Sequence, residues 1–155
     1  MEILRQIINN RILWVGILSW FIAQVFKTIN NVIITGKFSI ERMWGDGGMP
    51  SGHSATVSSV ALACGLYEGF TSPIFAVALI VAIIVMHDAI NERLPAGKQP
   101  ALLNVMADMF EKVTGTDLPN DEKLKELLGH TPLQVIAGCL LGLLVATVCY
   151  LFFRG

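Results

Sequence analysis

Charged residues are scarce in this chain. Only 15% of its 155 residues are charged, whereas an ordinary soluble domain has about 25%. The 11 basic and 12 acidic residues almost cancel and leave a formal charge of −1. The sequence therefore lacks the high net charge of a disordered chain. It also lacks the basic surface that nucleic-acid binding needs, so we expect no nucleic-acid partner.

Cysteine is scarce as well, and its placement predicts no metal centre. Cys64, Cys139 and Cys149 all lie in apolar stretches. Their number is odd and their spacing matches no metal site, so the expected role is packing between helices. We predict neither a metal nor another cofactor. A small-residue cleavage site is also lacking after the first apolar stretch, which favours a retained helix over a removed signal.

Apolar residues are abundant, at 54%, and they gather in four blocks: 12–34, 55–70, 73–90 and 133–153. A helix needs about 20 mostly apolar residues to cross a bilayer, and about 17 at least. The first and fourth blocks reach this length, and the other two are marginal. A soluble bundle is the alternative, but long apolar blocks suit lipid contact better. We predict an all-α membrane bundle with about four transmembrane helices, formed by one domain over residues 1–155.

The connections between the blocks differ in length. A glycine-rich segment joins the first two blocks, and residues 69–72 form a tight hairpin between the second and third. The segment 91–132 is long. Its apolar residues at 102, 106, 109 and 113 recur at helical spacing among charges, which predicts a short amphipathic helix at the membrane surface. A second short helix is predicted to start near Pro119 and to end at Gly129.

All three histidines are predicted to lie on one side of the membrane. Because four crossings alternate in direction, the first and third blocks end where the second and fourth begin. His53, His87 and His130 lie at these positions. The charged residues expected beside them are Asp88, Lys37, Arg42, Arg93 and Lys98. Three histidines among cations predict a site for an anionic ligand.

Gln24, Lys27 and Asn31 fall on one face of the first predicted helix. Polar residues at membrane depth normally face the bundle interior, which would turn Lys27 toward the ligand. The alternative is that Lys27 snorkels to the membrane surface, which lies about 10 Å away at 1.5 Å per residue. The spacing alone leaves both orientations open.

Two short sequences at helix starts indicate phosphate binding. In Gly-Gly-Met-Pro-Ser-Gly-His-Ser, glycines and a proline lead into a helix whose free amides favour an anion, with Ser51 as a further donor. His53 is placed there to protonate a leaving oxygen. In the second sequence His130 starts a helix, and Gln134 follows one turn later, where it can fix the imidazole tautomer. Singly, each histidine fits a capping or interface role, but together they favour a phosphate site.

These sequences resemble signatures of the phosphatidic acid phosphatase type 2 (PAP2) superfamily, which includes vanadium haloperoxidases. Pro-Ser-Gly-His at 50–53 is similar to the second signature, and His-x-Pro-x-Gln at 130–134 is similar to the third. With Met-His-Asp-Ala at 86–89 and Ala-Gly-Lys-Gln at 96–99, they look most like the small divergent branch from bacteria and plastids.

The resemblance implies metal-independent hydrolysis of a phosphomonoester or diphosphate. It implies that His130 is the nucleophile that forms a phosphohistidine, that His53 is the general acid, and that Ser51 and Gly52 hold phosphate oxygens. The remaining residues expected at the phosphate are Lys27, Arg42, Arg93 and Lys98, with His87 and Asp88 behind them.

Three features depart from the superfamily pattern. The first signature pairs a lysine with Arg-Pro, and here Lys27 or Lys37 with Arg42 would replace that pair. An arginine is missing before the histidine of the third signature, and Arg93 would replace it. Gln134 stands where the pattern has an acid. An amide can orient a histidine, but it cannot stabilise an imidazolium by charge.

The sequence thus predicts a membrane lipid phosphatase. Its substrate would be a prenyl phosphate or diphosphate, phosphatidate or phosphatidylglycerophosphate. One alternative is a non-catalytic or weakened binder or transporter of phosphorylated lipids, which Gln134 favours. Another is a structural membrane protein whose histidines only cap helices. We also expect membrane lipids and a second copy of the chain as partners, because a site built from only four short helices needs a neighbour to exclude lipid. The small-residue pair Gly138 and Gly142 can pack closely within a chain or between chains.

The basic residues predict the orientation in the membrane. Seven of them lie on the side of the expected site, and three, Arg5, Arg11 and Arg154, lie on the other. Because cytoplasmic loops carry an excess of lysine and arginine, the site is predicted to face the cytoplasm, in a bacterial cell membrane.

Overall fold

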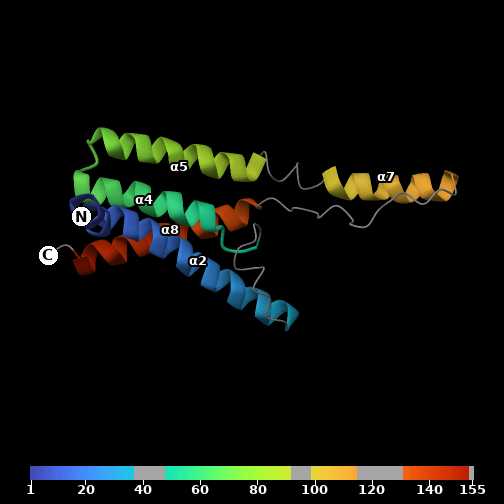
Figure 1. Cartoon of the computed structure of the whole chain (residues 1–155), viewed down its shortest axis with the longest axis horizontal. Coiled ribbons are helices and arrows are strands. Elements are labelled where there is room, and N and C mark those ends of the chain that lie inside the picture. Colours follow the sequence, from blue (N-terminus) through green and yellow to red (C-terminus); the bar gives the residue numbers. More distant parts are fainter. Residues whose placement is uncertain (37–47, 92–98, 115–130, 154–155) are drawn as a thin grey trace.

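The computed structural model describes residues 1–36, 48–91, 99–114 and 131–153. Its elements are the helices α1 (Glu2–Ile8), α2 (Arg11–Thr35), α4 (Gly52–Glu68), α5 (Pro73–Asn91), α7 (Gln99–Thr114) and α8 (Pro132–Phe153). Helices α2, α4, α5 and α8 form a bundle, and α7 lies apart from it (Figure 1). The prediction of an all-α membrane bundle is confirmed.

The helices begin and end close to the ends of the apolar blocks, because capping residues lie there. Asn10 caps α2 by accepting a hydrogen bond from the Leu13 amide at 3.0 Å. Gly36 ends α2 in the left-handed region, with φ 68°, where a residue without Cβ is unstrained. The predicted hairpin joins α4 to α5, and the predicted amphipathic helix is α7. Helix α1 is an addition to the prediction, and the second short helix predicted between 119 and 129 lies outside the described residues.

Within the described part of the chain, three helices are long and apolar enough to cross a membrane. They are α2, residues 73–90 of α5, and α8. Helix α4 has only 17 residues. It nevertheless packs against all three of the others, so it is the central helix of the bundle.

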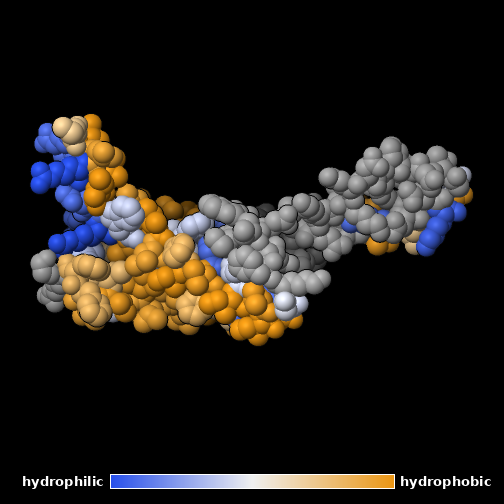
Figure 2. All heavy atoms as spheres, turned by 60° about the horizontal axis from the view of Figure 1, so that its bottom comes forward, coloured by the Kyte–Doolittle hydropathy of each residue, from blue (hydrophilic) through white to orange (hydrophobic). Residues whose placement is uncertain are grey.

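Small residues make this central position possible. The buried residues of α4 are Gly52, Ser54, Ala55, Ser58, Ser59, Ala61, Ala63, Cys64 and Gly65. Small side chains let helix backbones approach closely, which is how helices pack inside membranes. The large apolar side chains of α2, α5 and α8 point outward instead. The surface of the bundle in Figure 2 is accordingly mostly hydrophobic, and hydrophilic residues gather at the end that holds the N-terminus.

The contact between α4 and α8 depends on two glycines. A Cβ added at Gly138 would overlap the backbone carbonyl of Ser51, and one added at Gly142 would overlap the Ala55 carbonyl. The Ser58 hydroxyl also donates a hydrogen bond to the Cys139 carbonyl at 3.2 Å. The predicted small-residue pair therefore packs within the chain. The homo-oligomer remains a prediction, and it no longer has this pair as its support.

The close approach of α8 to α4 predicts the effect of a substitution. Gly138→Val should lower the free energy of unfolding by about 1–3 kcal/mol, because the added atoms meet the Ser51 backbone, which cannot rotate away. The measurement is thermal unfolding of the purified protein in detergent, followed by circular dichroism. Leu140→Val on the exposed face of α8 is the control and should change the midpoint little. Equal midpoints for Gly138→Val and the wild type would contradict the described packing.

Candidate active site

The predicted site lies at one end of the bundle. Helices α2 and α5 end there, and α4 and α8 begin there (Figure 1). At the opposite end the Arg11 guanidinium donates a hydrogen bond to the Phe153 carbonyl at 2.6 Å. The alternation of the four helices is therefore as predicted.

Ser51 is fully buried and caps α4. Its hydroxyl oxygen accepts hydrogen bonds from the Ser54 amide at 3.4 Å and from the Ser54 hydroxyl at 3.0 Å. Such a cap satisfies an amide that the helix leaves unpaired. Serine at this position thus has a structural role besides the predicted one. In both bonds the Ser51 hydroxyl oxygen is the acceptor.

The first turn of α8 is bonded to the same loop. The Ser51 backbone amide donates to the Gln134 carbonyl at 3.0 Å. The Gln134 side-chain oxygen accepts from the Thr131 amide at 3.1 Å, and the Thr131 hydroxyl accepts from the Gln134 amide at 3.4 Å. This reciprocal pair is a capping box, which the spacing Thr-x-x-Gln signals in a sequence. The predicted contact of Gln134 with His130 falls outside the described residues.

Gly52 opens α4 and allows side chains of α2 to approach. A Cβ at Gly52 would lie 3.5 Å from the Gln24 side-chain nitrogen and 3.6 Å from Trp20 Cδ1. Among the described residues the Gly52 amide has no hydrogen-bond partner, and such amides at a helix start attract anions. The next residue, His53, is exposed, so a ligand at this turn can reach it.

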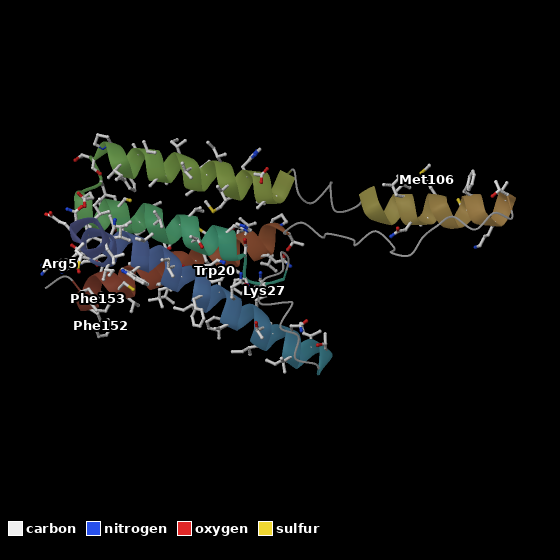
Figure 3. All side chains as sticks on the ribbon, in the orientation of Figure 1. Arg5, Trp20, Lys27, Met106, Phe152 and Phe153 are labelled. Atoms are coloured by element: carbon white, nitrogen blue, oxygen red, sulfur yellow. The ribbon has the colours of Figure 1, made fainter. Side chains whose placement is uncertain are left out.

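Lys27 points into the bundle rather than toward the membrane surface. It is only 5% exposed, and its Cγ lies 3.2 Å from the position of a Cβ at Gly48, whose φ of 88° favours glycine. Gln24 is buried and Asn31 is half-buried on the same face. Of the two orientations that the sequence left open, the inward one is observed. Figure 3 shows Lys27 and Trp20 on α2 beside the start of α4.

Two further predicted residues lie at this end of the bundle, on the last turns of α5. His87 is exposed and Asp88 is half-buried. The predicted site residues outside the described residues are Arg42, Arg93, Lys98 and His130, together with Lys37. Among the residues that the structure describes, no three His, Cys, Asp or Glu side chains are grouped so that they could hold a metal ion.

An apolar groove begins beside the first turn of α4. It lies between α2, α4 and α5, with a volume of about 710 Å³. Trp20, which borders Gly52, lines it, and so does Ile12, about 12 Å away along α2 at 1.5 Å per residue. The other large apolar side chains along it are Leu13, Ile17, Val60, Ile74 and Val77. The groove therefore runs from Trp20, beside the first turn of α4, to the starts of α2 and α5 at the opposite end of the bundle.

Comparison with known proteins agrees with the fold and with the motifs. Residues 8–145 match the divergent PAP2 family. The chain is 37% identical over 139 residues to the uncharacterized membrane protein YuiD of Bacillus subtilis (strain 168), a match that covers 84% of this chain and 88% of that protein. No solved structure matches the chain. This integral membrane protein therefore belongs to the divergent PAP2 family.

Proposed function

We propose that this protein is a membrane phosphatase that hydrolyses a lipid phosphomonoester or diphosphate without a metal. The observation that carries the proposal is the hydrogen bond of 3.0 Å from the Ser51 amide to the Gln134 carbonyl. This bond holds the loop that leads into His53 against the helix turn that follows His130 in the sequence. Membership of the divergent PAP2 family supports a PAP2-like chemistry.

In the proposed mechanism a phosphate group lies against the first turn of α4. The Gly52 amide and the Ser51 hydroxyl donate hydrogen bonds to its oxygens, and the Lys27 ammonium balances its charge. His130 attacks the phosphorus and forms a phosphohistidine, while His53 protonates the departing lipid oxygen. Water then attacks the phosphohistidine, gives a proton to His53 and releases inorganic phosphate. Further cations would come from Arg42, Arg93 and Lys98, with His87 and Asp88 behind them.

The apolar groove supports a lipid as the substrate. Its Trp20 end adjoins Gly52, so a lipid tail in the groove would place its phosphate at the start of α4. Prenyl phosphates and diphosphates, phosphatidate and phosphatidylglycerophosphate all combine such a tail with a phosphate.

The direct test is phosphate release from these lipids by the purified protein in detergent. The wild type should release phosphate and vanadate should inhibit it, whereas His130→Ala should remove turnover. His53→Ala should lose least with an activated aryl phosphate, since a good leaving group needs little general acid catalysis. Binding of lipid phosphates without any release would favour the binder or transporter. Full activity after replacement of both histidines would show that they have no catalytic role and would favour a role as helix caps only.

The departure at Gln134 gives a sharper prediction. Gln134→Glu should keep the capping box, because glutamate serves at this position as well as glutamine. Its carboxylate adds a charge-assisted hydrogen bond to the His130 imidazole, so turnover should rise about tenfold, which corresponds to about 1.4 kcal/mol of barrier.

Gln134→Ala is the control, because it removes both the cap and any support of His130. It should lower stability by about 1 kcal/mol and should lower turnover. If neither substitution changes turnover, residue 134 does not act on the nucleophile.

We further propose that the site faces the cytoplasm of a bacterial cell, because the sequence has seven basic residues in the segments that connect the helices on the site's side and three in those on the other. Thr114→Cys at the exposed end of α7 reports on this side. A membrane-impermeant maleimide should label it only after the cells are permeabilised, with the wild-type chain as the background. Labelling in intact cells would reverse the orientation.

A further inference from the structure

Gln24 carries a polar atom whose surroundings need an explanation. Its side chain is 8% exposed, and its oxygen Oε1 is buried without a hydrogen-bond partner among the described residues. A buried polar group left unpaired destabilises the folded protein. The large majority of buried side-chain polar atoms in proteins are paired, and an exception can mark a water or ion that completes the site. Gln24 is therefore a candidate ligand contact.

The position of Gln24 indicates where this ligand lies. Its amide group is at the start of α4, since its nitrogen Nε2 is 3.5 Å from the Cβ position of Gly52. Trp20 and Lys27 lie one helical turn before and after it on α2, and both face the same end of α4 (Figure 3). The Gly52 amide, a donor with no partner among the described residues, and the side-chain amide that carries the Oε1 acceptor of Gln24 thus both lie at the first turn of α4. A ligand there must accept one hydrogen bond and donate another.

The chemistry of phosphate meets both requirements. A deprotonated phosphate oxygen accepts a hydrogen bond from a helix-start amide. A protonated phosphate oxygen donates one, and a phosphomonoester keeps such a proton below its second pKa of about 6. Inorganic phosphate, the product of the proposed reaction, keeps at least one proton at neutral pH. A fully deprotonated anion such as sulfate offers no donor to Oε1.

We propose that Gln24 contacts the ligand directly and accepts a hydrogen bond from the protonated oxygen of a phosphate bound at the first turn of α4. This inference rests on the proposed phosphate site and adds a residue that selects for protonated phosphate. Lys27 supplies charge beside it, whereas Gln24 supplies selectivity, because an acceptor is repelled by any oxygen that carries no hydrogen. Tightly bound anions without a proton are disfavoured as a result.

The test compares phosphate with sulfate, by calorimetric titration of the purified protein in detergent. Gln24→Met keeps the length of the side chain but removes the acceptor. It should weaken phosphate binding about tenfold, the loss expected for one hydrogen bond to a charged group, and should strengthen sulfate binding rather than weaken it, because the repulsive acceptor is gone. Its thermal midpoint should not fall, because an unpaired buried polar group is replaced by an apolar one of similar shape. Gln6→Met, the same change on exposed α1, should alter none of the three values.

Each outcome bears on the inference. Equal weakening of phosphate and sulfate, or unchanged binding of both, would overturn it, as would a wild type that binds neither anion. Gln24→Asn shortens the side chain by one methylene and so withdraws the amide from the ligand. It should also weaken phosphate binding selectively. Because it keeps the amide, it serves as a second variant if Gln24→Met fails to fold. Selective loss of phosphate binding in a protein that releases no phosphate from lipids would uphold the role of Gln24 and refute the proposed phosphatase activity.

Discussion

The rest of the structure depends on the close contact between α4 and α8. Gly138 and Gly142 let the two backbones meet, because a side chain at either position would overlap carbonyl oxygens of α4. With the helices this close, the Ser51 amide reaches the Gln134 carbonyl. Two sequences that are some eighty residues apart are thereby joined at one end of the bundle. The proposed chemistry needs this junction, since one histidine belongs to each sequence.

The helices could be predicted closely because their signals are local. Asn10 and Gly36 bound α2, and Pro73 and Pro132 open α5 and α8, as caps and helix-start prolines usually do. The central role of α4 could not be predicted in the same way. Its serines and alanines lower its hydropathy, and only the packing against three neighbours explains them. Helix α1 has no side-chain cap at its start, so the sequence carries no local signal that predicts it.

The site was predictable to the level of helix ends, but not to the level of single contacts. Alternation of the helices places Ser51, Gly52 and His53, at the start of α4, at the same end as Gln134 in the first turn of α8. The partner of the Gln134 side chain could not be predicted, because the Thr131 backbone amide and the His130 ring, three and four residues earlier, are both within reach of it along the helix. The choice between burial and snorkelling for Lys27 likewise depends on whether a neighbouring loop covers it, and Gly48 does. Such contacts depend on tertiary packing, which spacing along one helix does not contain.

The central claim is that the phosphoryl group is transferred to His130. Trapping this covalent phosphohistidine tests the claim most directly. The purified protein would be mixed with a prenyl phosphate that carries radioactive phosphorus, quenched in alkali and digested. We predict a label that survives alkali, is lost in acid and maps to the peptide that contains His130. Phosphate release without any such label, or a label on His53 instead, would contradict the account.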